Sequence, residues 1–273
     1  MKPRPFDYAR PSSVEEALAL LAEHGEEARV LAGGQTLIAM LNLRVVEPAV
    51  LIDITRVAEL DVVREADGKV EVGAAVTQGR LLAWPALAHK LPLVGAVLPF
   101  VGHFQTRNKG TVCGSIAHAD PASEIPLALA VLEGEVVLRS RRGTRVLAAK
   151  DFQQGMLTTA RAADELITAV RFPVAQGGVA FREIARRHGD FAIVAVAALA
   201  DGGDGIRLGV AGMAERPAVC RVPSESAGLQ DAIERLAWEL EGYEDIHASA
   251  HMRRDLLRRI GPVVAREAVR CAA

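Results

Sequence analysis

The chain has 273 residues, which is enough for two domains or for one large domain with a sizeable buried core. Half of the residues are hydrophobic and 24% are charged, as in a folded protein in water, and the formal net charge of −2 excludes a basic surface for nucleic acid. No apolar run is long enough to span a membrane and no signal peptide is indicated, so we expect a cytoplasmic protein.

The first 56 residues predict a small α/β unit. The stretch SSVEE at 12–16 is a capping box that begins a helix over 14–23. An apolar strand over 28–32 leads into a glycine turn at Gly33 and a helix over 37–43. A second strand over 50–54 is expected to pair parallel with the first.

The remainder predicts two further units with antiparallel sheets. Strands over 69–74, 135–138, 144–147 and 164–172, with helices after residue 77 and over 87–97, form the unit 57–173. The unit 174–273 is expected to contain a three-stranded meander over 179–185, 193–199 and 206–210, with a turn over 202–205. Helices over 226–240, 248–260 and 263–269 follow, and Pro262 is expected to start the last one.

A polar, glycine-rich segment over 102–126, GHFQTRNKGTVCGSIAHADPASEIP, is typical of a ligand-binding loop. Gly110 and Gly114 allow backbone N–H groups to approach a ligand, and successive N–H groups in such a turn suit phosphate oxygens. Arg107 and Lys109 would supply positive charge. The alternative interpretation is an ordinary surface loop.

The turn Gly33 to Leu37 is a second phosphate candidate. It lies at a helix N-terminus, where free N–H groups and the helix dipole favour an anion, although a tight turn without a ligand is the alternative. Neither GxGxxG after a strand nor the Walker motif occurs, so the commonest nucleotide-binding folds are not indicated. Two separate glycine turns favour instead a diphosphate held by two loops, as in flavoproteins whose FAD lies between subdomains.

Three polar side chains in the long loop allow a catalytic or a structural interpretation. His118 and Asp120 could act as acid and base near a bound ring. We prefer a structural role, in which Asp120 starts a turn and caps the following helix while His118 bonds locally. Cys113 has no adjacent base, and we interpret it as a close-packed small residue. The three cysteines form no CxxC pair, so no disulfide framework, iron–sulfur cluster or zinc site is predicted in this chain.

The segments AGGQTLIAMLNLR (32–44) and RNKGTVCGSIAHADPASEIP (107–126) together resemble the two FAD motifs of the medium subunit of the molybdenum hydroxylases. This family includes bacterial carbon monoxide dehydrogenase and the flavin domain of xanthine dehydrogenase. Further similar stretches follow in the same order, from KPRPFDYARPSSVEEALALL through FREIARRHGDFAIV to DIHASAHMRRDLLRRI. The resemblance therefore extends over nearly the whole chain.

The resemblance implies an α+β fold with FAD in the cleft between the α/β unit 1–56 and the α+β unit 57–173, followed by a sheet with helices over 174–273. It implies that Leu31 to Leu37 wrap the diphosphate and ribityl chain and that Thr111 to Ser115 hold the other side. The cofactor-binding residues implied by position are Leu31, Ala32, Gly33, Gly34, Gln35, Thr36, Leu37, Val101, Thr111, Val112, Cys113, Gly114, Ser115, His118, Asp120, Glu124, Ile167 and Arg182.

Two further residues would lie near the isoalloxazine ring. By the same resemblance, Phe191 would cover a face of the ring and Asp190 would alter its electrostatics; the alternative is a solvated, charged hairpin tip. No catalytic side chain and no metal ligand are implied, because the flavin carries the chemistry. Cys113 stands where the family often has glycine, so we expect its φ to be negative.

The implied function is an electron-transfer flavoprotein subunit of an oxidoreductase. A large partner would bind the molybdenum cofactor and a small partner would carry 2Fe–2S clusters, in a dimer of heterotrimers. FAD in this chain would pass electrons to an external acceptor that the sequence does not identify. The alternatives are a self-sufficient flavin oxidoreductase acting on a small organic substrate and a non-enzymatic nucleotide-binding module.

Overall fold

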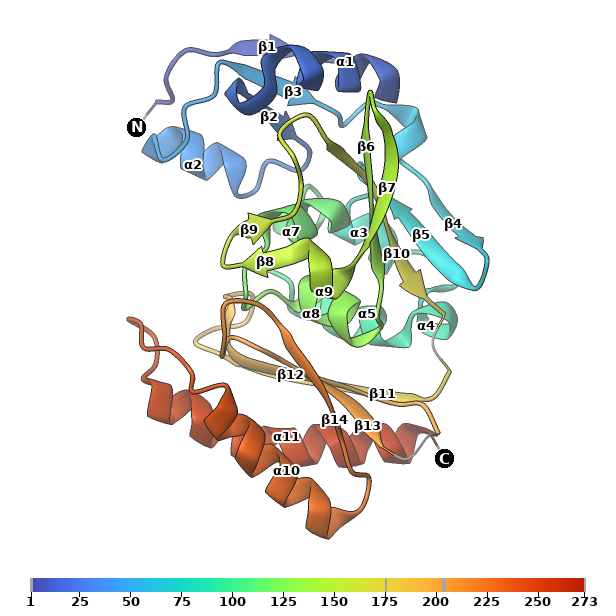
Figure 1. Cartoon of the computed structure of the whole chain (residues 1–273), viewed down its shortest axis with the longest axis vertical. Helices are drawn as coiled ribbons and strands as arrows, with labels where there is room; N and C mark the ends of the chain where they lie inside the picture. The colour runs from blue at the N-terminus through green and yellow to red at the C-terminus, as the bar shows by residue number, and fades with distance from the viewer. Residues whose placement is uncertain (1, 175, 203–204, 273) are drawn as a thin grey trace.

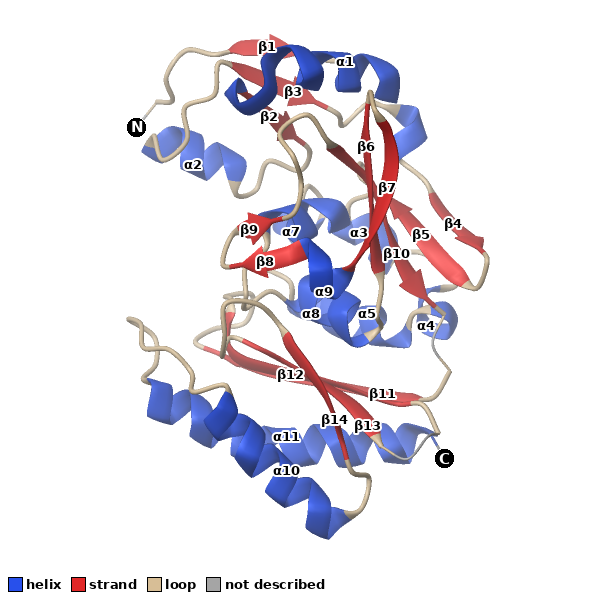
Figure 2. Cartoon of the chain, in the orientation of Figure 1, coloured by secondary structure: helices blue, strands red, loops and turns tan. Residues whose placement is uncertain are grey.

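The computed structural model describes residues 2–174, 176–202 and 205–272. Within these ranges the chain forms three layers, each built on its own sheet, stacked from the N-terminal layer to the C-terminal layer (Figure 1). All three layers contain both helices and strands, and the two larger sheets are antiparallel, which confirms the predicted α+β class (Figure 2). Residues 203 and 204 of the predicted turn lie outside the described residues.

The N-terminal layer is a parallel sheet with strand order β1-β3-β2, covered by helix α1. The capping box forms, because Ser13 Oγ accepts from Glu16 N at 3.1 Å while a Glu16 carboxylate oxygen accepts from Ser12 N at 2.7 Å. The apolar face of α1 is buried on the sheet. The elements are β1 (Asp7–Ala9), α1 (Val14–His24), η1 (Gly25–Glu27), β2 (Ala28–Leu31), α2 (Leu37–Leu43) and β3 (Val50–Asp53).

The middle layer contains an antiparallel sheet of order β4-β5-β10-β6-β7, with short helices beside it. The helix expected over 87–97 is broken at Leu91, because Pro92 disfavours helical backbone in the residue before it. The elements are η2 (Ala58–Leu60), β4 (Val63–Ala66), β5 (Lys69–Gly73), α3 (Gln78–Leu82), α4 (Leu87–Lys90), α5 (Pro92–Val97), η3 (Leu98–Phe100), α6 (Phe104–Arg107), α7 (Val112–His118), α8 (Glu124–Val131), β6 (Glu135–Ser140), β7 (Gly143–Ala148), α9 (Ala149–Phe152), β8 (Gln153–Gly155), β9 (Thr158–Thr159) and β10 (Leu166–Pro173).

The C-terminal layer differs from the expectation in two ways. In the described residues its antiparallel sheet has four strands, because β14 adds an edge strand beside β13. The last two predicted helices are one helix that continues through Pro262. The elements are β11 (Gly178–Ala185), β12 (Ala192–Ala200), β13 (Ile206–Ala211), β14 (Ala218–Val222), α10 (Ser226–Glu239) and α11 (Ala250–Ala272).

Burial explains why α11 tolerates its proline. Proline inside a helix removes one backbone hydrogen bond and costs about 3 kcal/mol. Leu257 lies before Pro262 and Val264 and Ala268 lie after it, and all three are buried in the cluster that α10 and α11 form with the sheet. A break at Pro262 would separate the two halves of this apolar face, so continuous packing outweighs the lost bond.

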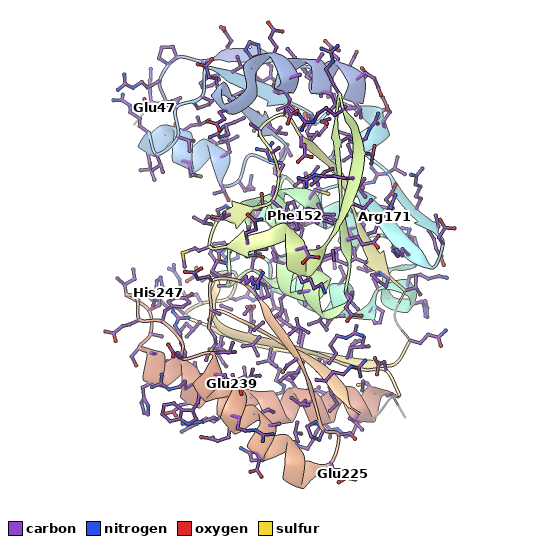
Figure 3. The ribbon with its side chains drawn as sticks, viewed as in Figure 1. Glu47, Phe152, Arg171, Glu225, Glu239 and His247 are labelled. Carbon is purple, nitrogen blue, oxygen red and sulfur yellow. The ribbon has the colours of Figure 1, made fainter. Side chains whose placement is uncertain are left out.

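The middle and C-terminal layers share one core. Strand β12 is buried along its whole length. Ala195 and Ala197 pack into the cluster of the middle layer, whereas Val194 and Val196 pack against α10 and α11. Side chains fill the space between the layers, and Phe152 lies within the middle layer with 1% of its surface exposed (Figure 3). The C-terminal sheet is therefore packed on both faces.

Candidate functional site

A cavity of about 1000 Å³ extends through all three layers. The N-terminal layer contributes the turn Gly33 to Leu37, the middle layer contributes Thr111 and the start of α7, and the C-terminal layer contributes the turn Gly189 to Phe191. This volume is at the upper end of the range for small-molecule sites, which is about 300–1,000 Å³. The cavity therefore suits a long ligand that contacts each layer in turn.

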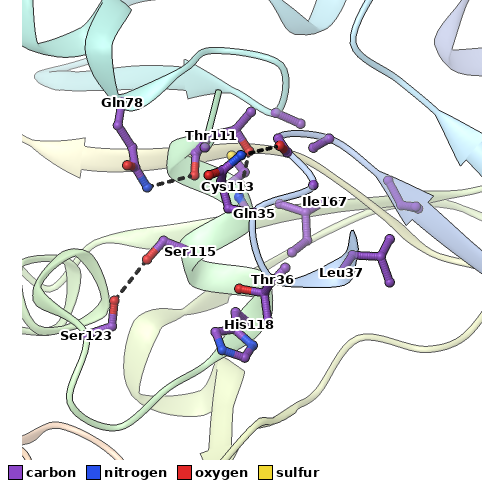
Figure 4. A pocket seen from close by; sticks show the side chains of 18 of the residues that line it. Gln35, Thr36, Leu37, Gln78, Thr111, Cys113, Ser115, His118, Ser123 and Ile167 are labelled. Atoms are coloured by element: carbon purple, nitrogen blue, oxygen red, sulfur yellow. Dashed lines mark hydrogen bonds between the residues drawn. The ribbon is translucent and has the colours of Figure 1, made fainter. Parts of the chain in front are cut away.

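The two predicted glycine turns meet at the centre of this cavity (Figure 4). A Cβ atom added to Gly33 would lie 2.3 Å from the backbone oxygen of Lys109 and 2.6 Å from the Cα atom of Gly110. Real Cβ atoms essentially never approach so closely, so only glycine fits at position 33. Gln35 Nε2 also donates to the Gly33 carbonyl at 3.2 Å, which holds the first turn closed.

The first turn has unused hydrogen-bond donors. Among the described residues, no group accepts a hydrogen bond from the backbone N–H of any residue from Gly33 to Leu37. The Thr36 hydroxyl does not cap α2, although Thr36 occupies the N-cap position. These residues line the cavity, and Gly34 has a φ of +68°, the backbone conformation that lets such a turn form. A row of free donors of this kind suits the oxygens of a diphosphate.

The second turn is fixed by its own hydrogen bonds. Gly114 N donates to Thr111 Oγ1 at 2.9 Å, which caps α7, and Gln78 N donates to the Gly110 carbonyl at 2.8 Å. Cys113 lies inside α7 and is absent from the residues with positive φ, so the expectation for its backbone is confirmed. Burial raises the pKa of the Cys113 thiol well above its ordinary range, which makes it a packed and unreactive side chain.

Beyond the second turn, Asp120 and His118 have different environments. Asp120 accepts from Ala122 N at 2.8 Å and so forms the expected turn before α8, but it does not cap that helix, whose N-cap residue is Ser123. The expected local hydrogen bond of the His118 ring is not found among the described residues either, because the ring faces the cavity. His118 lines the cavity, and burial lowers its pKa against the opposing effect of the Asp120 charge. A hydrogen bond of 3.0 Å between the hydroxyls of Ser115 and Ser123 connects α7 with the start of α8 (Figure 4).

A buried carboxyl group lies at the start of α8. Glu124 lines the cavity with 3% of its surface exposed, and burial together with the charge of Asp120 raises its pKa to about 7. Burial and the charge of Glu124 in turn raise the pKa of Glu183, on β11, to about 8. Two carboxyl groups from different layers thus influence each other, and Glu124 is the one that lines the cavity.

The C-terminal end of the cavity is formed by the turn between β11 and β12. Gly189 has a φ of +86° and packs so closely on His103 that an added Cβ would lie 2.8 Å from its ring. Asp190 and Phe191 line the cavity, and Phe191 keeps 54% of its surface exposed. The Asp190 carboxylate accepts from Arg187 Nε at 3.1 Å, which lowers the pKa of Asp190.

Most of the implied cofactor residues come together in this cavity, although their contact with FAD stays a prediction. Arg182 does not line it, because it points to the other side of β11 and forms a 3.1 Å ion pair with Glu267 on α11. Val112 is fully buried in the core, Leu31 ends β2 behind the turn, and Asp120 lies outside the lining. The implied residues that do line the cavity are Ala32, Gly33, Gly34, Gln35, Thr36, Leu37, Val101, Thr111, Cys113, Gly114, Ser115, His118, Glu124 and Ile167.

The source of positive charge differs from the sequence prediction. Neither Arg107 nor Lys109 lines the cavity, and Arg107 Nη1 donates to backbone carbonyls of the preceding loop, including Gly102 at 2.9 Å. Instead Arg29 and Arg161 line the end formed by the N-terminal layer. Burial and the charge of Arg29 lower the pKa of Arg161, so the two guanidinium groups lie near each other. They occur in no motif, and the sequence carries no signal for them.

The described residues contain neither a membrane-spanning helix nor a metal-binding cluster. No helix in that part of the chain is both long and apolar enough to cross a membrane. No group of three or more His, Cys, Asp and Glu side chains in it is arranged to hold a metal ion.

Comparison with known proteins identifies the family. Residues 4–175 match the family described as FAD binding domain in molybdopterin dehydrogenase. The chain is 41% identical over 202 residues to the caffeine dehydrogenase subunit beta of Pseudomonas sp. (strain CBB1), covering 73% of this chain and 68% of that protein. It is 35% identical over 274 residues to the nicotine 6-hydroxylase medium subunit of Paenarthrobacter nicotinovorans, covering 95% and 96% of the two chains.

A solved structure agrees over the full length. Quinoline 2-oxidoreductase from Pseudomonas putida 86 superposes with a TM-score of 0.93 at 33% identity, covering 100% of this chain and 99% of that chain. These matches confirm the resemblance inferred from the two glycine motifs. The chain belongs to the family of FAD-binding subunits of the molybdenum hydroxylases, and it is an oxidoreductase subunit whose cofactor is FAD.

Proposed function

We propose that this chain holds FAD in the three-layer cavity and passes electrons from the iron–sulfur clusters of a small partner subunit to an external acceptor. The observation that carries the proposal is the meeting of the two glycine turns, with Gly33 against Lys109 and Gly110 and free N–H groups from Gly33 to Leu37. A diphosphate at this point would receive donors that no protein group uses in the described part of the chain. When bound, FAD supplies a ring that accepts and releases electrons.

The ends of the cavity support one orientation of the cofactor. Phe191 offers an aromatic face at the C-terminal end, where the resemblance places the isoalloxazine ring. Arg29 and Arg161 offer guanidinium groups at the opposite end, and neither forms an ion pair within the described residues. Guanidinium groups stack on aromatic planes and donate to ring nitrogens, so this end suits the adenosine half of FAD.

The partners follow from the family. The nicotine 6-hydroxylase relative is named as a medium subunit, and the Afipia carboxidovorans carbon monoxide dehydrogenase relative as a medium chain. We propose a heterotrimer in which a large subunit binds the molybdenum cofactor and hydroxylates the substrate, a small subunit carries the 2Fe–2S clusters, and two heterotrimers associate. The cytoplasmic location expected from the sequence belongs to this proposal.

Purification of the full chain tests the proposal. We expect about one FAD per chain, with flavin absorbance in the visible range, and co-purification with molybdenum and iron when the neighbouring genes are expressed together. In the assembled complex, the substrate should reduce the flavin. With the isolated chain, the same substrate should leave the flavin oxidised. This pair of results would support the subunit role. A purified chain without FAD would refute the proposal, and turnover of an organic substrate by the isolated chain would favour a self-sufficient oxidoreductase.

A further inference from the structure

Arg253 is a buried cation in the C-terminal layer. It lies on α11, which packs on the outer face of the C-terminal sheet (Figure 1). Only 1% of the surface of Arg253 is exposed, whereas the other arginines of α11 are partly or fully exposed. A guanidinium group is costly to bury unless its donors are paired. The partners of Arg253 therefore indicate what this side chain holds in place.

The Arg253 guanidinium donates to three separate segments. Its Nη1 atom donates to the Ile193 carbonyl at 2.5 Å and to the Gly212 carbonyl at 2.8 Å. Its Nε atom donates to the Tyr243 carbonyl at 3.1 Å, and the group lies 4.1 Å from the centre of the Tyr243 ring. Its Nη2 atom donates to the Asp245 carboxylate at 2.6 Å. One side chain thus joins the start of β12, the end of β13 and the loop before α11.

The first of these acceptors belongs to a β-bulge. The register between β11 and β12 shifts at this point, where Ile184 is opposite Val194 and Ala185 is opposite Ala192. Ile193 is therefore the extra residue of β12, and the ladder with β11 leaves it unpaired. The guanidinium group satisfies the Ile193 carbonyl, which would otherwise be a buried acceptor without a donor.

The bulge lies directly beside the turn Gly189 to Phe191, two residues after Phe191. The other end of this turn is held by the close packing of Gly189 on His103. Phe191 lines the cavity but keeps 54% of its surface exposed, so its own packing contacts are few. Bulges beside ligand sites commonly set the direction of a side chain. The position of Phe191 therefore depends on the backbone anchors at the two ends of the turn.

The same guanidinium group also reaches a second segment of the cavity wall. Gly212 N donates to the Pro121 carbonyl at 3.0 Å, and Pro121 lies in the turn that leads to Ser123 and Glu124, which line the cavity. Gly212 has a φ of +78°, and an added Cβ would lie 2.5 Å from the carbonyl oxygen of the bulge. The bulge and the turn before α8 are thus fixed to each other through one small residue.

We propose that Arg253 is a positioning residue, which fixes the bulge at Ile193 and so holds Phe191 over the isoalloxazine ring of bound FAD. This inference rests on the proposed function, which places the ring at the Phe191 end of the cavity. Arg253 does not line the cavity, so it acts through the turn and does not touch the cofactor. Without the guanidinium group the start of β12 loosens, and Phe191 leaves the ring more open to water.

Quenching of flavin fluorescence by iodide measures the exposure of the ring and tests the inference. The FAD-loaded full chain is titrated with potassium iodide at constant ionic strength. We expect Arg253→Met to raise the quenching constant at least about twofold, because local opening of the turn exposes the ring. Loss of a cation by itself lowers the local concentration of iodide, so a rise cannot come from the change of charge.

Leu257→Ala is the matched control for stability. Leu257 is fully buried one turn along α11 from Arg253, in the cluster that α10 and α11 form with the sheet. Its truncation destabilises the same layer but leaves the hydrogen bonds of Arg253 in place. We expect this variant to keep the wild-type quenching constant.

Phe191→Ala tests the route by which Arg253 acts. We expect this variant to raise the quenching constant, and we expect Arg253→Met to add nothing further in the Phe191→Ala background, because both changes remove the same cover. An unchanged constant in Arg253→Met, an equal rise in Leu257→Ala, or a full effect of Arg253→Met in the Phe191→Ala background would overturn the inference.

A second variant keeps the test open if Arg253→Met does not fold or does not retain FAD. Arg253→Lys keeps the positive charge, but a single ammonium nitrogen cannot reach all four partners of the guanidinium group at once. We expect it to raise the quenching constant as well, and the same contrary outcomes apply to it. A wild-type chain that binds no FAD would overturn the proposed function instead.

Discussion

Substitution of Gly33 by alanine is the most direct test of the two-turn site. The new Cβ atom would lie 2.3 Å from the Lys109 backbone oxygen, and ordinary contact begins at 3.4 Å, so the turns would have to separate by about 1.1 Å (3.4 − 2.3). Overpacking of this kind costs about 1–3 kcal/mol, because the opposing atoms are backbone and have no rotamer to change. We expect this loss in the free energy of unfolding and at least a tenfold weaker affinity for FAD, since tenfold corresponds to about 1.4 kcal/mol.

The matched control is Gly95→Ala in α5. Its added Cβ would lie 3.6 Å from Leu87 Cγ, an ordinary contact, and alanine is favoured over glycine inside a helix by about 1 kcal/mol. Urea denaturation of the FAD-free chain and fluorescence titration with FAD measure both quantities. If Gly33→Ala unfolds within about 0.5 kcal/mol of the wild type and binds FAD with unchanged affinity, the two turns do not form the site as described.

Three further predictions follow from buried groups. Arg253 is 1% exposed and donates to the Ile193 and Gly212 carbonyls at 2.5 and 2.8 Å, so Arg253→Met should lower the free energy of unfolding by about 3–5 kcal/mol in urea denaturation. Because burial raises the folded pKa of Glu124 to about 7 from 4.5, stability present below pH 4.5 is lost as pH rises through 7. In the wild type, the free energy of unfolding should therefore fall by up to about 3 kcal/mol over this pH range because of Glu124, and in Glu124→Gln this part of the fall should be missing. The same pH dependence of unfolding in both proteins would refute the prediction. Iodoacetamide at pH 8 should label exposed Cys271 and spare Cys113, as mass spectrometry of peptides would show.

The sequence predicted the elements that depend on local signals. The capping box of α1, the strand-turn-helix around Gly33 and the long strands of the third layer all appear where the pattern placed them. The exceptions depend on tertiary packing. Pro262 is a strong local break, yet α11 continues through it because both halves are buried on one sheet. Strand β14 is short and half-exposed, so its pattern was too weak to separate from a loop.

The site shows the same division. Glycines whose conformation is dictated by close approach, such as Gly33, were visible as motif residues. The direction of a side chain on a strand that is packed on both faces could not be predicted from the sequence. Arg182 and Glu183 are both polar, so the pattern does not tell which of them faces the middle layer. Arg29 and Arg161 come from separate layers, and only the folded chain brings them to one end of the cavity.

Under the proposed function, the shared core of the middle and C-terminal layers restricts how electrons can reach the flavin. Gly209 on β13 lies so close to α8 that an added Cβ would approach Val131 Cγ2 to 2.3 Å, and the alanines of β12 complete this tight junction. The middle and C-terminal layers therefore do not move apart by a hinge motion, because separating them would expose their shared hydrophobic core. Access to the Phe191 end of the cavity is therefore set when the chain folds. Under the proposed function, exchange of electrons then depends on which molecule docks at the exposed Phe191 side chain.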